Sequence, residues 1–170
     1  VADINPDGSA DPGEIFALDG KPYFTANDND DDERELYSYS PSSGQVMMEA
    51  TLSNGGDVNY LSLIHVAEGT LFLTGLGLET GVELYKFTPG DSDLTLAADI
   101  NQTTIGSDPY GFTAYNGKLN FGADEANSGR EIWVYDPGTG ETELLSDEEG
   151  STNPYGFTVL DGKLYFAGRH

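Results

Sequence analysis

With 170 residues, of which 37% are hydrophobic, the chain is long enough to bury a core as one domain, which excludes disorder throughout. Seven Lys and Arg against 30 Asp and Glu residues give a formal net charge of −23, which repels phosphate backbones and excludes nucleic acid as a partner. Cysteine is absent, which excludes disulfides, thiolate nucleophiles and cysteine-based zinc sites.

One hairpin pattern recurs four times along the chain: an apolar run, a turn-forming pair that ends in glycine, and a second apolar run. The turn glycines are Gly20, Gly69, Gly117 and Gly162. Asp-Gly, Glu-Gly and Asn-Gly pairs accept the positive φ angles of tight hairpin turns. Each occurrence therefore predicts the first two strands of a repeating unit.

A second pattern follows the first three hairpins and predicts a third strand. It reads Arg-Glu-Leu-Tyr at 34–37, Val-Glu-Leu-Tyr at 82–85 and Arg-Glu-Ile-Trp at 130–133. A turn and a short fourth strand come next, at 45–50, 94–98 and 142–145. Four antiparallel strands in a period of roughly 48 residues are typical of a β-propeller blade.

The sequence thus predicts an all-β domain over residues 1–170, a β-propeller-like array of about 3.5 four-stranded blades. The expected units are 5–51, 52–98, 99–146, and 147–170 joined by 1–4. In a closed four-bladed ring, Val1–Ile4 would complete the last blade. The alternatives are a segment of a longer array, or a half-blade that pairs with another chain because unpaired strand edges invite such addition.

Three segments resemble the bacterial ELWxxDGT repeat family: Gly129–Gly138, Asn116–Phe121 and Ala98–Asn101. Trp133 keeps the tryptophan of the family pattern, whereas Tyr37 and Tyr85 replace it. The resemblance covers essentially the whole chain. It implies propeller-like blades in large exported or surface-attached proteins and carries no catalytic residues.

The stretch from residue 3 to residue 14 satisfies the spacing of an EF-hand calcium loop, although strands rather than helices are expected on both sides. Its oxygen-bearing side chains at alternate positions are those of Asp3, Asn5, Asp7, Ser9, Asp11 and Glu14. The sequence therefore indicates Ca²⁺ as a cofactor here. The alternative is an acidic loop between blades that binds no ion.

A second acidic run occupies residues 27–33, just before the third strand of the first unit. So many adjacent carboxylates repel one another unless they bind cations or stay solvated. If a cation binds, Asp28, Asp30 and Asp32 are the expected ligands. A solvated loop is the alternative.

Aromatic residues at three places are candidates for ligand binding. Tyr110 and Tyr155 open two copies of a Tyr-Gly-Phe sequence, and Trp133 lies in a third strand. Aromatic ring faces near the mouth of a propeller can stack on sugars, whereas the alternative is packing between blades.

No known catalytic pattern is found: the sequence lacks a serine nucleophile elbow, a phosphate-binding glycine loop, an HExxH helix and a sialidase box. His65 has no identifiable partner, so we expect a structural histidine and no enzyme activity. An acidic extracellular hydrolase stays as an alternative, because the spacing of carboxylate pairs cannot be read from the sequence.

The function expected is that of an exported or cell-surface binding or adhesion module that recognises a glycan or a protein. The acidic excess suits an extracellular medium rich in cations, although it also fits an ordinary soluble surface. No apolar run reaches the roughly 18 residues of a membrane-spanning helix, so membrane insertion is not expected. The structural alternative is a repeat protein that forms homo-oligomers through open blade edges.

Overall fold

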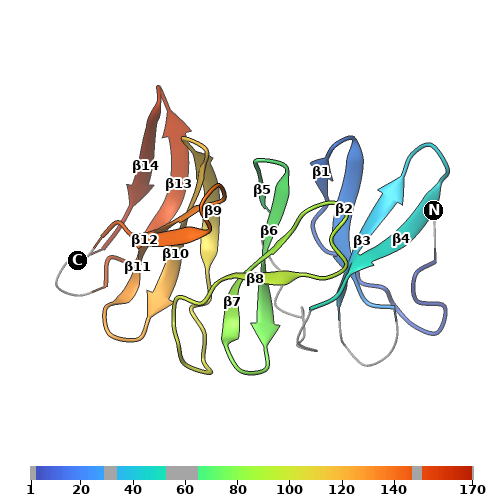
Figure 1. The fold of residues 1–170 in the computed structure, drawn as a ribbon, viewed down its shortest axis with the longest axis horizontal. Helices are drawn as coiled ribbons and strands as arrows, with labels where there is room; N and C mark the ends of the chain where they lie inside the picture. Colours follow the sequence, from blue (N-terminus) through green and yellow to red (C-terminus); the bar gives the residue numbers. More distant parts are fainter. Residues whose placement is uncertain (1–2, 29–33, 53–64, 147–150, 170) are drawn as a thin grey trace.

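The computed structural model describes residues 3–28, 34–52, 65–146 and 151–169, which form β-strands joined by turns and loops. Three antiparallel sheets contain four strands each, and a fourth contains two (Figure 1). Strands pair in chain order within every sheet. Across these ranges, no helix has the length and apolar character needed to cross a bilayer.

The first blade contains β1 (Phe16–Leu18), β2 (Lys21–Ala26), β3 (Glu35–Ser40) and β4 (Gln45–Ala50). The second blade contains β5 (His65–Ala67), β6 (Thr70–Gly77), β7 (Gly81–Phe87) and β8 (Thr95–Ala98). The third blade contains β9 (Tyr110–Tyr115), β10 (Lys118–Glu125), β11 (Gly129–Asp136) and β12 (Glu141–Leu144). The terminal half-blade contains β13 (Tyr155–Leu160) and β14 (Lys163–Ala167). These sheets confirm the predicted all-β repeat.

All four hairpin turns adopt the geometry that the sequence predicts. In the first, Asp19 and Gly20 have φ angles of 51° and 76°, and in the third, Asn116 and Gly117 have 52° and 73°. Two consecutive positive φ angles define the turn type that matches the twist of the flanking strands. The pair therefore sets the register of the first two strands of each blade.

The sheets lie side by side, with their first strands β1, β5, β9 and β13 adjacent in that order. The core between the first and second blades contains Leu18, Tyr23, Leu36, Ala50, Leu52, Leu71, Leu73, Tyr85, Phe87 and Leu94. The core between the second and third contains Ala67, Phe72, Leu84, Ala98, Ile100, Leu119, Phe121, Ala123 and Tyr135. Neighbouring blades therefore bury each other's apolar faces.

A buried glutamate near the start of the third strand joins one blade to the loop before the first strand of the next blade. We call this loop the leading loop of that next blade. Glu83 in β7 accepts hydrogen bonds from the backbone nitrogens of Ile100 (3.2 Å) and Asn101 (3.3 Å) and from the Ser107 hydroxyl. Burial raises the pKa of Glu83 to about 7, although these hydrogen bonds act to lower it. We call this arrangement a carboxylate clasp.

The same clasp recurs at the next junction. Glu131 in β11 accepts hydrogen bonds from the Thr152 backbone nitrogen (3.0 Å), the Thr152 hydroxyl and the Ser146 hydroxyl (2.6 Å). Because an unpaired buried carboxylate is costly, the donors and the acid depend on each other. The glutamate of the repeated third-strand pattern therefore acts as a joint between blades.

The sequence leaves three arrangements of the array open, and the described residues do not show the pairing that would close a ring. Ile4 packs in the apolar cluster of the first blade that contains Phe24 and Val46. Figure 1 shows β2, β3 and β4 of that blade at the opposite side of the molecule from β13 and β14. Asp3 and Ile4 form no strand with the terminal hairpin, and Val1 lies outside the described residues. The apolar contacts of Ile4 hold this segment on the first blade.

Candidate functional site

The first strands of all four sheets converge on one hollow of about 370 Å³. Its lining residues are Phe16 of β1, His65 of β5, Gly111, Phe112 and Thr113 of β9, and Gly156 and Phe157 of β13. Because every sheet contributes its innermost strand, the hollow occupies the position of the central axis in a propeller. We call it the axial hollow.

The repeated Tyr-Gly-Phe sequence shapes two walls of the axial hollow. Gly111 and Gly156 have φ angles of 70° and 67°, at a point where the registers of β9 with β10 and of β13 with β14 are interrupted. A Cβ atom on Gly111 would lie 2.9 Å from the Phe157 ring. Glycine is therefore required here both for its backbone conformation and for the close approach of Phe157.

The axial hollow is uncharged and mainly apolar. Its described lining includes no Asp or Glu, in a chain of net charge −23. The Nε2 atom of His65 is buried and has no hydrogen-bond partner among the described residues. Burial lowers the pKa of His65, so the imidazole is neutral at neutral pH. The axial hollow therefore offers a ligand the phenylalanine rings and one face of a neutral imidazole.

Sequence reasoning assigned His65 a structural role and missed its place in the axial hollow. The signal available was its register: His65 stands four residues before the turn glycine, as Phe16 does in the first unit and Thr113 in the third. These positions lie far apart in the sequence and meet only because the first strands are adjacent.

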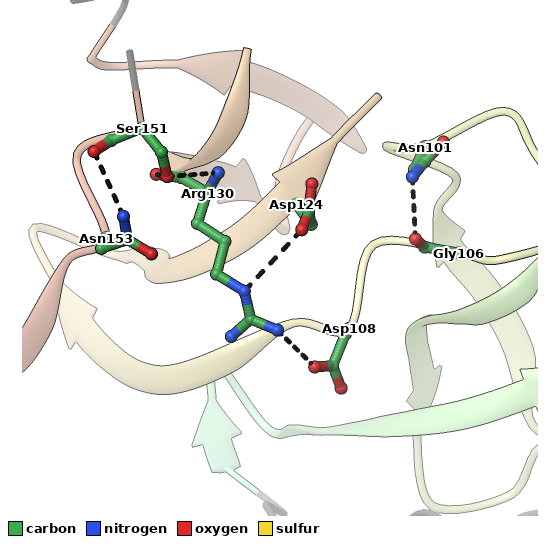
Figure 2. A network of polar contacts seen from close by, with 7 residues as sticks. All are labelled: Asn101, Gly106, Asp108, Asp124, Arg130, Ser151 and Asn153. Carbon is green, nitrogen blue, oxygen red and sulfur yellow. Dashed lines mark hydrogen bonds and ion pairs between the residues drawn. The ribbon is translucent and has the colours of Figure 1, made fainter. Parts of the chain in front are cut away.

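Tyr110 is held by its own blade. The Tyr110 ring lies over Gly122 of the neighbouring strand β10, where a Cβ atom would be only 2.5 Å from the ring. The guanidinium of Arg130, in β11, lies 5.2 Å from the centroid of the same ring. Figure 2 shows Arg130 reaching both Asp108 (2.8 Å) and Asp124 (3.7 Å). Burial raises the pKa of Tyr110. These contacts describe packing within the third blade.

The other two predicted aromatic residues lie in different surroundings. Trp133 is partly buried against the core between the second and third blades, and its Nε1 atom has no partner there. Tyr155 is 53% exposed on the half-blade. None of the three predicted aromatic residues lines the axial hollow, so their role in ligand binding stays a prediction.

The predicted calcium loop lies along the first blade. Asn5 is buried and donates its side-chain amide to the Ser9 carbonyl oxygen (3.4 Å), while Asp11 forms an ion pair with Arg34. The remaining predicted ligands, which are Asp3, Asp7, Ser9 and Glu14, are exposed. The described part of the chain contains no group of three Asp, Glu or His side chains arranged to hold a metal. Calcium binding therefore stays a prediction.

The second acidic run is described only at its start. The Asp28 carboxylate interacts with the Tyr37 hydroxyl, and burial together with this contact raises the pKa of Tyr37. Asp30 and Asp32 lie outside the described residues. The cation site predicted there likewise stays a prediction.

Comparison with known proteins shows the fold alone. No family model and no curated protein matches the sequence. Among solved structures, puromycin hydrolase matches 91% of this chain over 24% of its own length, with a TM-score of 0.61 and 15% identity. A prolyl endopeptidase matches 90% over 23% of its length, with a TM-score of 0.58 and 12% identity. TolB from Acinetobacter baumannii matches 93% over 39% of its length, with a TM-score of 0.55 and 18% identity.

These matches are to β-propeller domains, and the chain spans well under half the length of each of the three proteins. At identities below one in five, the likeness concerns architecture and carries no activity to this chain. The four-stranded antiparallel sheets are therefore blades of the β-propeller type, arranged around the axial hollow.

Proposed function

We propose that the chain is a non-catalytic binding module of an exported or cell-surface protein, and that the axial hollow holds an uncharged part of a glycan or peptide ligand. The observation that carries the proposal is the convergence of Phe16, Phe112, Phe157 and His65 on one hollow. Ligand sites are mostly concave and apolar, with a few polar groups that fix orientation.

The chemistry of the axial hollow favours a neutral ring. Aromatic faces pack well against the C–H face of a sugar or against an apolar side chain. Release of water from these apolar surfaces makes the binding free energy more favourable. A neutral imidazole can form one hydrogen bond with a hydroxyl or an amide. The net charge of −23 repels anionic ligands before they reach the hollow.

The absence of a described carboxylate in the lining supports binding rather than hydrolysis. A histidine acts as a general base when a second group orients it, and His65 has no such hydrogen bond among the described residues. Glycoside hydrolysis needs two carboxyl groups on either side of the bond that breaks. The lining offers neither arrangement.

The test starts from glycan and peptide arrays, followed by calorimetric titration of the strongest hits. Thr113→Phe fills the hollow, so we expect at least a tenfold loss of affinity. Thr95→Phe, at an exposed position of β8, is the matched control and should bind as the parent protein does. Unchanged affinity in Thr113→Phe would place the ligand elsewhere, and ligand turnover would replace this proposal with an enzyme.

A further inference from the structure

One wall of the axial hollow lies only a few residues after a carboxylate clasp. Ser107, whose hydroxyl donates a hydrogen bond to Glu83, precedes Gly111 of that wall by four residues. Asp108, between them, has a φ angle of 45°, and Pro109 follows it with the φ angle that its ring restricts. Because proline also restricts the residue before it, a displacement of Ser107 is passed along this short segment to Gly111.

Ser107 is held by two blades at once. Its backbone nitrogen donates a hydrogen bond to the Val82 carbonyl oxygen of the second blade (2.8 Å), next to the Glu83 carboxylate that binds its hydroxyl. Its carbonyl oxygen accepts a hydrogen bond from the Asp124 backbone nitrogen of the third blade (2.7 Å). The second blade therefore determines where the leading loop of the third blade lies, and with it the start of β9.

The wall that contains Gly156 is connected in the same way. Thr152 donates hydrogen bonds from its hydroxyl and its backbone nitrogen to Glu131 of the third blade. Its carbonyl oxygen accepts one from the Arg169 backbone nitrogen of the half-blade (2.8 Å). Asn153, with a φ angle of 43°, and a proline again separate the clasp from the wall, and Gly156 stands four residues after Thr152. Each of these two walls is thus tied to the blade before it.

The two walls fit together closely. A Cβ atom on Gly111 would lie 2.9 Å from the Phe157 ring, so this ring lies directly over the Gly111 backbone. In the third blade, Phe112 packs against Phe121, with ring centroids 5.5 Å apart. In the half-blade, Phe157 packs against Phe166, with centroids 6.0 Å apart. Because these rings move with their sheets, a displaced wall changes the shape of the axial hollow.

We propose that Glu83 and Glu131 are positioning residues for the axial hollow, each of which holds the Tyr-Gly-Phe wall of the following blade in the place that a ligand requires. The inference rests on the proposed function, because it treats the hollow as the ligand site. Neither glutamate lines the hollow, so both act through the hydroxyl residue of the next leading loop. Loss of a clasp therefore reduces the fraction of molecules whose wall is in the binding-competent place, and the apparent affinity falls with that fraction.

Ionisation of Glu83 gives this role a signature that a general loss of packing does not have. The pKa of Glu83 is about 7 in the folded protein, because burial raises it more than the hydrogen bonds of the clasp lower it. Asp99 of the leading loop acts on Glu83 by its charge and raises this pKa further, whereas the other leading-loop groups in contact with it are uncharged donors. Its neighbour across the strand pair on β6 is the uncharged Gly75. Proton loss above pH 7 therefore places an unfavourable charge in the clasp, and the wall should loosen as the pH rises.

The first test follows the wall itself by NMR. A Cβ atom would take the place of one α-hydrogen of Gly111, so the chemical shift of that hydrogen reports how closely the Phe157 ring lies over it. We expect this shift to titrate with a midpoint near pH 7 in the parent protein and to lose that titration in Glu83→Gln. It should keep the titration in Glu141→Gln, at an exposed glutamate of β12. The same pH dependence in all three proteins would overturn the proposal, and any titration of His65 is common to all of them.

The second test measures affinity by calorimetric titration, with the neutral aryl glycoside phenyl glucoside as the probe. At about pH 6, where Glu83 is protonated, Glu83→Ala and Glu131→Ala should each bind roughly fivefold more weakly than the parent protein. Glu83→Gln keeps an accepting oxygen and should restore binding to within about twofold, and Glu141→Ala is the matched control. Unchanged affinity in Glu83→Ala would overturn the proposal. No binding of phenyl glucoside to the parent protein would count against the proposed function, while the NMR titration still decides whether Glu83 positions the wall.

Discussion

The two ends of the array treat the same kind of apolar face in different ways. At the first blade, Ile4 and Ala10 fold back over the outer face, and Phe24 is only 8% exposed. At the half-blade, no described segment folds back, and Phe166 stays largely open. A blade face is thus covered where a local loop supplies apolar side chains, and it stays exposed where no described segment lies over it.

The described leading loops also differ in the side chain at one equivalent position. Ser107 and Thr152 occupy equivalent positions, and both donate a hydroxyl hydrogen bond to the glutamate of the preceding blade. The first leading loop has Ala10 at this position, and no described blade precedes it. The hydroxyl therefore accompanies a described junction between blades, whereas the methyl group of Ala10 packs in the apolar cluster on the outer face of the first blade.

The largest expected effect comes from one aromatic position in two blades. Phe121→Ala empties a fully buried site in the core between the second and third blades and should cost about 4 kcal/mol of the free energy of unfolding. Phe166→Ala, at the matching exposed position, should cost less than about 1 kcal/mol. Urea unfolding followed by Tyr and Trp fluorescence measures both. Equal losses would show that Phe166 is buried in solution by some partner.

The clasp at Glu83 should make stability depend on pH. The folded-state pKa of about 7 lies above the ordinary value of 4.5 for a glutamate, chiefly because of burial, so the folded protein holds this proton more tightly than the unfolded chain. The stabilisation is complete below pH 4.5 and is lost as the pH rises through 7, by up to about 1 kcal/mol per pH unit.

Urea midpoints measured across this pH window test that sign. In Glu83→Gln, the part of the fall in unfolding free energy that comes from residue 83 should disappear, because the amide does not titrate. Glu125→Gln, at a carboxylate that is solvent-accessible, is the comparison variant. A fall of the same size in Glu83→Gln as in the parent protein would contradict the assignment to Glu83.

The hydroxyl of the second clasp has a smaller effect. Thr152→Val removes one donor from the buried carboxylate of Glu131 and should cost about 1 to 2 kcal/mol. Ala10→Ser, which adds a hydroxyl at the capped end, should change stability by less than about 0.5 kcal/mol. Thermal melting gives both values, and hydrogen exchange should speed up in β13 and β14 only for Thr152→Val. Equal effects at the two ends would remove the distinction between a junction and a cap.

The sequence predicted the repeat and the hairpins because those features are local. The pair at Asp19 and Gly20 fixes its turn through its own backbone preferences, and the spacing of such pairs gives the period. The clasps and the axial hollow were not predicted. Glu131 and Thr152 are 21 residues apart, and nothing in the spacing of an acid and a hydroxyl shows that a blade junction brings them together.

Ring closure through Val1–Ile4 and the calcium loop were inferred from pattern alone, which carries no information about the tertiary contacts of Ile4 and Asp11. The similarity of Val1–Ile4 to the end of a fourth strand gave no information about Phe24, against which Ile4 packs. Asp11 fits a ligand position by spacing, yet Arg34, which is 23 residues away, forms an ion pair with it. Charge partners distant in sequence can compete with a cation for the same carboxylate.

The smallest expected effect is that of this exposed ion pair. Arg34→Gln should lower the free energy of unfolding by no more than about 1 kcal/mol, because solvent and salt screen the charges. The loss should shrink further in 1 M salt, whereas the loss in Phe121→Ala should not. Urea titrations at two salt concentrations provide the measurement. A loss that persists at high salt would indicate packing by the arginine stem instead.

The carboxylate clasp has a consequence for how such chains change in length over evolution. Both halves of the joint are encoded in the repeating unit: the acid in its third strand and the hydroxyl in the loop that precedes its first strand. Duplication of one whole unit in a gene would therefore create a new junction that already has its donor and its acceptor. Chains of this design can gain or lose blades without evolving a new fastening each time.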